Sequence, residues 1–312
     1  MGAGAVGSYY GALLARTGHN VTFVARGPHL GALTEAGAIT VREPDGADWR
    51  ATVRATATPG VDPADLILLT TKSHDTRAAA MALAPVIGPG TLIVSLQNGV
   101  ENVARIRAAL PEATLVAGLV FVGLAITTPG RVDHYGEGRV TIGDPDGRAS
   151  DAPAAVARIA DTAWDLSVTA DIVRAQWTKL LWNIGFNTLC AVTGATAGEV
   201  LATPESAALV NAAVAEANAI ARAEGIDIAA NDIADIPTYR PAMRGFLPST
   251  AQDIAAGKEP ERDILTAFVM REGRRLGIPT PVNDTLDALL ALQADRATGR
   301  TASSPLFRAD EG

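Results

Sequence analysis

The chain has 312 residues, of which 48% are hydrophobic and 19% are charged. This composition supplies enough apolar surface for one large core or two smaller ones and excludes a wholly disordered chain. The net charge of −8 comes from 26 basic and 34 acidic residues without a cluster of Lys and Arg, so we expect no binding to nucleic acid. The single cysteine, Cys190, excludes an internal disulfide and favours a reducing, cytoplasmic location.

The first half of the chain alternates short apolar runs with segments of helical character. After a glycine-rich start, a helix is expected from about Ala5 and another over residues 28–37. Strands are expected at residues 20–25, 65–71 and 90–99. Strands that alternate with helices predict right-handed crossovers and a parallel sheet.

Two segments between residues 113 and 144 complete this half. Residues 113–130 are uncharged, but their glycines, threonines and Pro129 predict a buried strand that runs into a turn, so we expect no membrane span. Residues 130–144 alternate around several glycines, which predicts a hairpin with a glycine-rich turn.

From about residue 152 onward, strand signals nearly vanish. Helical periodicity is found in four Ala-, Leu- and Ile-rich segments, residues 175–192, 205–224, 261–276 and 282–298. The predicted fold is therefore an α/β Rossmann-type N-terminal domain over residues 1–165, followed by an all-α domain over residues 166–312. A homodimer is compatible with the alanine-rich helices, although no sequence feature fixes the oligomeric state.

The glycine-rich start matches the G-x-G-x-x-G pattern of dinucleotide-binding loops. Gly2 would permit the tight turn, Gly4 would let the backbone approach a pyrophosphate, and Gly7 would allow close packing of the helix. The N–H groups around Ala5 and Val6 would then point at the phosphates. The alternative is a glycine-rich turn without a ligand.

A strand normally precedes such a loop, but here Met1 alone precedes Gly2. The missing strand would lie at the centre of the sheet, so its absence predicts unpaired neighbouring strands. We expect that the start is placed too late or that the chain is truncated.

Three further residues directly follow predicted strands, at the edge of the sheet where ligands bind. Arg26 stands where NAD-specific sites place an acidic residue, and its guanidinium favours the 2′-phosphate of NADP. Lys72 supplies a second cation, and Asn98 a side-chain amide for nicotinamide or substrate. The alternatives are a solvated Arg26 and an ordinary Asn-Gly turn at Asn98.

A polar stripe crosses an otherwise apolar helix in the second half. Lys179, Asn183 and Asn187 are spaced by four, so they share one helical face. Burial would lower the pKa of Lys179 toward the range useful for proton transfer. The alternative is a surface face with solvated polar groups. Ser249 and Glu261 have equally ordinary interpretations, as a helix N-cap and as a first-turn acid.

The four histidines and Cys190 show no ligand spacing, so no metal site is expected. The nucleophile elbow G-x-S-x-G and the phosphate loop G-x-x-x-x-G-K-[ST] are also absent.

In their order and spacing, these segments resemble the ketopantoate reductase (2-dehydropantoate 2-reductase) family. The resemblance rests on GAGAVGSYYG, VTFVARGPHL, LILLTTK, SLQNGVEN, PGRVDHYGEGRVTIG, KLLWNIGFNTLCAVTGAT and PSTAQDIAAGKEPERD. It implies an NADP-binding Rossmann domain joined to a helical domain, and reduction of ketopantoate to pantoate in pantothenate biosynthesis.

The resemblance also implies residue roles. Lys179 would be the general acid, and Glu261 would organise the lysine and the ligand. The glycine loop, Arg26 and Lys72 would hold NADPH. Contacts to cofactor or substrate would come from Asn98, Asn183 and Asn187, and Ser249 would bind the substrate carboxylate.

Two positions depart from the family pattern. Ala197 stands where the family often has asparagine in a GxxNGE-like turn, and Phe246 replaces a substrate-contacting asparagine three residues before Ser249. The loss of two amides would weaken recognition of ketopantoate, because a polar substrate needs those hydrogen bonds replaced. The expected reaction is NADPH-dependent reduction of a 2-keto acid, with ketopantoate favoured. The alternatives are another keto acid, carbonyl or imine, and a non-catalytic NADP-binding sensor.

Overall fold

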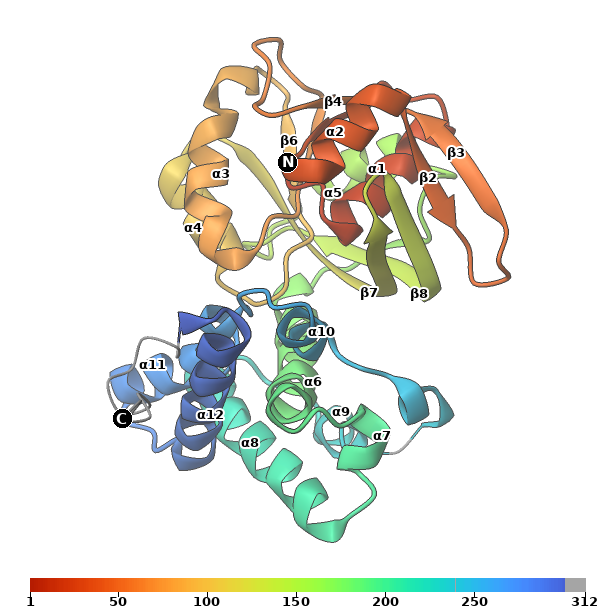
Figure 1. Ribbon diagram of the computed structural model, residues 1–312. Helices are drawn as coiled ribbons and strands as arrows, with labels where there is room; N and C mark the ends of the chain where they lie inside the picture. The colour runs from red at the N-terminus through yellow and green to blue at the C-terminus, as the bar shows by residue number, and fades with distance from the viewer. Residues whose placement is uncertain (239, 301–312) are drawn as a thin grey trace, which may run out of the picture. The chain divides into compact units, whose positions relative to one another are not determined.

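The computed structural model describes residues 1–238 and 240–300, and the chain divides into two compact units. The first unit ends at Gln176 and the second begins at Trp177. The boundary predicted after residue 165 precedes β9 (Leu166–Val168), which pairs with a strand of the first unit. An α/β unit is followed by a helical one, which confirms the predicted fold class (Figure 1).

The larger sheet of the first unit is mixed and follows the order β3-β2-β8-β7-β6-β5, with β9 beside β8. Strands β5, β6 and β7 are parallel, as predicted, whereas β7 with β8 and β2 with β3 are antiparallel. The strands are β2 (Ala38–Arg42), β3 (Asp48–Thr52), β5 (Leu66–Leu69), β6 (Leu92–Ser95), β7 (Thr114–Thr128) and β8 (Arg131–Gly143).

A second, two-stranded parallel sheet contains β1 (Thr22–Val24) and β4 (Arg54–Thr56). Within the described residues no strand precedes the glycine loop, and the sheet divides at this point. The first residues of the chain join the two parts, because Gly2 and Ala3 donate N–H groups to Val24 O at 3.2 Å and the Thr70 N–H reaches Met1 O at 3.0 Å. Burial lowers the pKa of the Met1 α-amino group to about 5.

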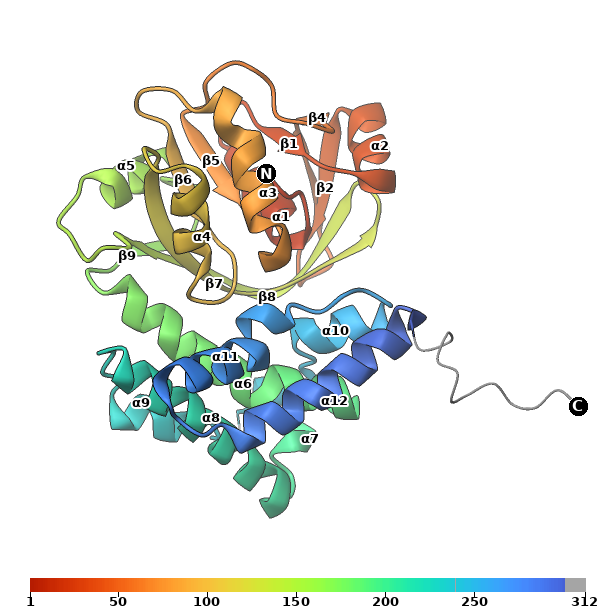
Figure 2. The same ribbon diagram turned by 90° about the vertical axis from the view of Figure 1, so that its left-hand side faces the viewer.

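Helices cover both faces of the sheet, and strand β6 shows why. Its side chains alternate, so that Leu92 and Val94 pack in one apolar cluster and Ile93 in another. The first cluster contains residues of α1 (Ala5–Arg16) and α5 (Ala152–Ile159). The second contains residues of α3 (Thr76–Leu83) and α4 (Asn102–Ala109), which Figures 1 and 2 show side by side. Helix α2 (Gly27–Ala36) follows β1, and the 3₁₀ turns are η1 (Ser73–Asp75) and η2 (Ala84–Val86).

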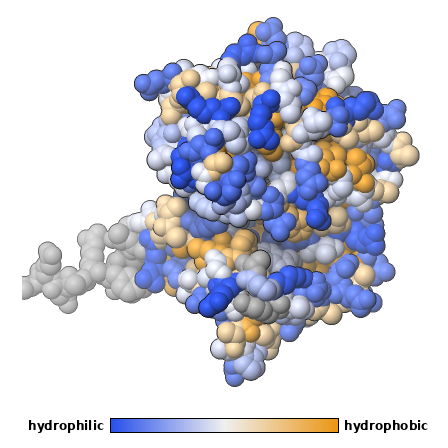
Figure 3. Space-filling model, turned by 90° about the vertical axis from the view of Figure 1, so that its right-hand side faces the viewer, coloured by the Kyte–Doolittle hydropathy of each residue, from blue (hydrophilic) through white to orange (hydrophobic). Residues whose placement is uncertain are grey.

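The hairpin predicted within residues 130–144 is wrong, because these residues form the single strand β8. Its partner is β7, and the chain reverses at Pro129 and Gly130, so that residues 113–130 form the predicted strand and turn. Gly136 and Gly138 lie in a stretch where the pairing register shifts, which is typical of β-bulges. None of the described helices is long and apolar enough to cross a membrane. On the face drawn in Figure 3, apolar residues form separate patches among polar ones on each unit.

The second unit is helical, and its long helix α6 (Ile172–Thr193) begins in the first unit. The other helices are α7 (Ala197–Val200), α8 (Pro204–Ala223), α9 (Ala230–Asp235), α10 (Ser249–Ala255), α11 (Thr266–Leu276) and α12 (Pro281–Ala297). The 3₁₀ turns are η3 (Pro241–Gly245) and η4 (Arg262–Ile264). The helix predicted over residues 261–276 is therefore interrupted at Leu265, which separates η4 from α11.

Two helical glycines provide a test of packing in the first unit. A Cβ at Gly11 in α1 would lie 2.4 Å from the Phe23 ring, whereas a Cβ at Gly31 in α2 would meet nothing within 4 Å. We expect Gly11→Ala to lower the free energy of unfolding by ~1–3 kcal/mol through overpacking. Gly31→Ala should raise it by ~0.5–1 kcal/mol, because alanine loses less backbone entropy on folding. Urea titration followed by circular dichroism measures both; equal shifts in the two variants would contradict this packing.

Candidate functional site

The glycine loop is held by strand β5 and the residue that follows it. Thr70 Oγ1 donates to Gly2 O at 2.7 Å, and Gly2 has a φ of +91°, which favours glycine. From this turn the chain enters α1, with Gly4 in extended conformation at its N-cap. The first turn of α1 therefore presents N–H groups that can donate hydrogen bonds to an anion.

The three glycines have different steric surroundings. A Cβ at Gly2 would lie 2.6 Å from Thr71 N, and one at Gly7 would lie 2.3 Å from Thr70 Oγ1. The fold itself therefore requires these two glycines. A Cβ at Gly4 would meet its nearest atom, Gly2 O, at 4.0 Å. Space in front of Gly4 is open, which fits a ligand that approaches the backbone there.

A series of hydrogen bonds that the sequence did not reveal connects the glycine loop to α2 and to the turn between β7 and β8. The Gly130 N–H donates to His29 Nδ1 at 3.0 Å, which leaves Nε2 to donate to Ser8 Oγ at 3.1 Å. Ser8 Oγ in turn donates to Ala3 O at 3.3 Å. Burial lowers the pKa of His29, in accord with a neutral ring whose Nδ1 accepts a hydrogen bond.

The predicted cations lie after β1 and β5. Arg26 precedes α2 as its N-cap residue, and its side chain is 87% exposed. Its guanidinium donates to Asp75 Oδ2 at 2.6 Å, so the loops after β1 and β5 meet here. Lys72 is half-buried and precedes the turn η1 that contains Asp75. An exposed ion pair of this kind contributes little to the free energy of unfolding. An anion of higher charge can therefore displace the Asp75 carboxylate from the Arg26 guanidinium.

The backbone of Asn98 is fixed after β6 by an amide network. Asn102 Nδ2 donates to Asn98 O at 2.6 Å, and Thr76 Oγ1 donates to Asn102 Oδ1 at 3.0 Å. Gln97 is buried and donates to Thr71 O at 2.9 Å and to Thr76 Oγ1 at 2.7 Å. Gln97 therefore ties together the loops that follow β5 and β6.

The polar stripe on α6 is largely buried, as predicted. Asn183 and Asn187 are 6% and 4% exposed, and Lys179 is half-buried. Asn187 Nδ2 donates to Thr250 Oγ1 at 3.3 Å, which links α6 to α10. Asn187 Oδ1 is buried and has no hydrogen-bond partner among the described residues, although most buried polar atoms in proteins have one.

Two opposing effects act on the pKa of the Lys179 ammonium group. Burial lowers its pKa to about 8, and the negative charge of Glu261 opposes this by raising it. Glu261 is itself buried and precedes the turn η4. Both residues belong to the second unit, and the Glu261 carboxylate lies close enough to act on the charge of Lys179.

An ion pair of the neighbouring residue, Arg262, fixes the turn that follows Glu261. Arg262 Nη2 donates to Asp287 Oδ2 at 2.6 Å, and Thr266 Oγ1 donates to Asp287 Oδ1 at 3.0 Å. Asp287 lies on α12 with its side chain almost fully buried, so it fixes the turn that follows Glu261. No sequence pattern marks Arg262, Thr266 or Asp287, because their contact joins segments that are more than 20 residues apart.

Ser249 is the first residue of α10 and is exposed. Pro248 occupies the N-cap position, so the interpretation of Ser249 as an N-cap is wrong. Cys190 is buried in α6, and burial raises its pKa to about 12, which makes it a poor nucleophile. The described residues contain no group of three or more His, Cys, Asp or Glu side chains able to hold a metal ion.

The predicted residues thus form two groups, one on each unit. The glycine loop, Arg26, Lys72 and Asn98 lie at the ends of β1, β5 and β6. The other group lies on α6 and the segments around it, and contains Lys179, Asn183, Asn187, Ser249 and Glu261.

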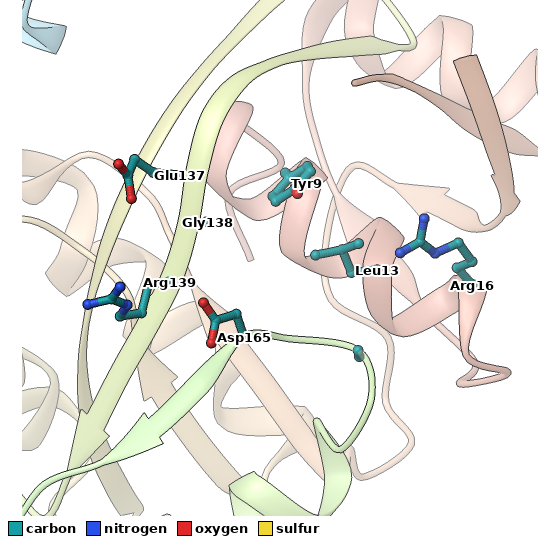
Figure 4. A pocket seen from close by; sticks show the side chains of 8 residues that line it. Tyr9, Leu13, Arg16, Glu137, Gly138, Arg139 and Asp165 are labelled. Atoms are coloured by element: carbon teal, nitrogen blue, oxygen red, sulfur yellow. The ribbon is translucent and has the colours of Figure 1, made fainter. Parts of the chain in front are cut away.

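A cavity of about 380 Å³ in the first unit has no lining residue in common with either group (Figure 4). It is lined by Tyr9, Leu13, Arg16, Glu137, Gly138, Arg139, Ala163 and Asp165. In the view of Figure 4, the Glu137 and Arg139 side chains lie on the far side of β8 from Tyr9. Its Arg16 guanidinium stacks on the Trp49 ring at 4.2 Å. We assign no function to this cavity.

Comparison with known proteins places both units in one family. Residues 1–147 match the family "Ketopantoate reductase PanE/ApbA", and residues 171–294 match its C-terminal domain. The 2-dehydropantoate 2-reductase of Caulobacter vibrioides is 35% identical over 294 residues, which cover 93% of this chain and 96% of the relative. That of Halobacterium salinarum is 33% identical over 295 residues, with the same coverage.

Solved structures agree. A PanE/ApbA family ketopantoate reductase from Ralstonia eutropha has a TM-score of 0.88 at 37% identity, covering 95% of this chain and 98% of its own. A D-mandelate dehydrogenase solved with NADH and anilino(oxo)acetate shares the fold, with a TM-score of 0.87 at 24% identity over 95% of this chain and 97% of its own. The chain belongs to the ketopantoate reductase PanE/ApbA family.

Proposed function

We propose that the protein reduces a 2-keto acid to a 2-hydroxy acid with NADPH, and that Lys179 is the general acid. The observation that carries this proposal is the half-buried Lys179 ammonium, whose pKa of about 8 lies close to physiological pH. The relatives named 2-dehydropantoate 2-reductases support a 2-keto acid as the substrate, and 2-dehydropantoate is the first member of this class to test.

The residues present fit a dinucleotide. The open space at Gly4 leaves room for a pyrophosphate beside the N–H groups of Ala5, Val6 and Gly7. Arg26 and Lys72 would bind a 2′-phosphate, and Asn98 would contact the nicotinamide end or the substrate. When bound, the reduced nicotinamide supplies the hydride that the keto carbon accepts.

Lys179 would act on the carbonyl oxygen of the substrate, whereas the hydride goes to the carbonyl carbon. As the C=O π bond breaks, negative charge develops on oxygen, and the ammonium stabilises this charge before it donates its proton. The products are a hydroxyl group and a neutral amine, which regains a proton from solvent. Asn183 and Asn187 would orient the substrate, Ser249 would donate to its carboxylate, and Glu261 would keep Lys179 charged.

We expect Lys179→Ala to lower turnover at least ~100-fold, the usual contribution of general-acid catalysis. Lys258→Ala, the loss of an exposed lysine, serves as the control. Steady-state rates of NADPH oxidation with 2-dehydropantoate and a panel of 2-keto acids measure both. A loss smaller than tenfold in Lys179→Ala would remove the proposed role.

The pH profile tests the same group by a different readout. Reduction needs the charged ammonium, so kcat/KM for reduction should fall as pH rises through about 8. Glu261→Gln removes a charge that raises the pKa of Lys179, so the falling limb should move to lower pH. A profile that does not move in Glu261→Gln would show that the carboxylate does not act on the titrating group.

Gly4→Ala separates cofactor binding from folding. Its Cβ meets no protein atom closer than 4.0 Å, and the backbone φ of −76° suits any residue, so stability should be unchanged. The methyl group would occupy the space of the pyrophosphate, and we expect NADPH to bind at least ~10-fold more weakly, a cost of ~1.4 kcal/mol or more. Fluorescence titration of NADPH measures the Kd, with Gly31→Ala as control. Unchanged affinity in Gly4→Ala would argue against this loop as the cofactor site.

Arg26→Ala tests the preference for NADPH over NADH. Loss of hydrogen bonds to a charged phosphate costs ~1.5–3 kcal/mol, so KM for NADPH should rise by ~10-fold or more. KM for NADH, which lacks this phosphate, should change little. Arg158→Ala, on the remote helix α5, is the matched control. If wild type and Arg26→Ala use the two cofactors in the same ratio, Arg26 does not select the cofactor.

A further inference from the structure

Three aromatic side chains border the polar stripe of α6. The rings of Trp182 and Phe186 lie 4.9 Å apart, and the Phe246 ring lies 5.7 Å from Trp182 at an angle of 64°. We call these three residues the aromatic cluster. Trp182 lies about 60° around the helix from Lys179, and Asn183 lies about 40° to the other side, because each residue advances ~100°. Trp182 therefore lies about one helical turn from Lys179, on the adjoining part of the helix surface.

The segment that carries Phe246 runs along the stripe. It contacts α6 at Trp182 through the Phe246 ring and at Asn187 through Thr250 Oγ1, and these two contacts lie on either side of Asn183. Ser249, the proposed carboxylate ligand, belongs to the same short segment. The Phe246 ring is thus held against the turn of α6 that follows Lys179, three residues before Ser249.

The two departures from the family pattern lie together in space. The Ala197 N–H donates to Phe246 O at 3.0 Å, and Ala197 is fully buried at the start of α7. Both positions therefore carry a side chain without a hydrogen-bonding group, where an amide would supply a donor and an acceptor. Phe246 remains 38% exposed, so its ring offers apolar surface to a ligand.

We propose that Phe246, supported by Trp182 and Ala197, selects 2-keto acids whose side chain is apolar and lacks the hydroxyl of ketopantoate. This inference rests on the proposed function and names its substrate class. A hydroxyl group placed against the phenyl ring loses hydrogen bonds to water without a replacement, whereas a methyl group there gains contact area.

The sharpest comparison uses two compounds that differ by this hydroxyl alone, ketopantoate and 3,3-dimethyl-2-oxobutanoate. We expect the wild-type enzyme to favour 3,3-dimethyl-2-oxobutanoate over ketopantoate by about tenfold or more in kcat/KM. This ratio is in the range by which a pocket discriminates a single polar group. Phe246→Asn should shift the ratio toward ketopantoate by about tenfold, because its amide can bond the hydroxyl. Phe246→Leu keeps an apolar surface and should retain the wild-type preference.

Phe121→Asn, at an exposed phenylalanine of β7 in the first unit, is the matched control and should leave the ratio unchanged. A wild-type preference for ketopantoate overturns the inference, as does a ratio that moves no more in Phe246→Asn than in this control. Phe246 is partly exposed and its carbonyl contact to Ala197 uses the backbone, so the variant should fold; if it does not, the ratio in wild type and in Phe246→Leu decides the matter. Reduction of both compounds with the reverse preference leaves the proposed function intact, whereas reduction of no 2-keto acid with NADPH or NADH removes the proposed function as well.

Discussion

The proposed chemistry of the second unit depends on the half-buried ammonium of Lys179. Removal from water disfavours its charge, and the carboxylate of Glu261 compensates in part, which leaves the pKa at about 8 instead of 10.5. Without the carboxylate the lysine would be neutral over more of the physiological range and would have no proton to donate. The proposed chemistry therefore requires that Glu261 be held close by.

That requirement extends into the helical packing. Glu261 has a fixed place because the next residue, Arg262, pairs with Asp287 on α12. The start of α12 is fixed in turn, since the Glu216 carboxylate of α8 accepts the N–H groups of Val282 and Asn283, both at 2.9 Å. A half-buried carboxylate at a helix N-terminus is favoured by the unpaired N–H groups of the first turn and by the helix dipole. The place of the carboxylate that raises the pKa of Lys179 thus depends on contacts among η4, α8 and α12.

Features set by local spacing were predictable from sequence, and long-range contacts were not. A spacing of four residues places Lys179, Asn183 and Asn187 on one helical face whatever surrounds the helix, and the glycine spacing of the first loop is equally local. His29 and Asp287 gave no such signal, because their partners Ser8 and Arg262 are distant in the chain. The wrong hairpin within residues 130–144 has a related cause. Glycines in an alternating run indicate a turn, but here they lie in bulges of β8, whose partner strand β7 precedes the run.

The two groups of residues place different constraints on the sequence. The glycine loop presents backbone N–H groups and needs little more than three glycines and Thr70 behind them, so many sequences can preserve it. Recognition of the substrate depends on side chains, and a few substitutions can change it without a change of fold. The fold resembles that of a D-mandelate dehydrogenase nearly as closely as that of a ketopantoate reductase, so fold similarity cannot choose between substrates. The choice has to come from positions such as Ala197 and Phe246. Because a backbone hydrogen bond joins these two residues, a substitution at one changes the surroundings of the other, and we expect their effects on substrate choice to be coupled rather than additive.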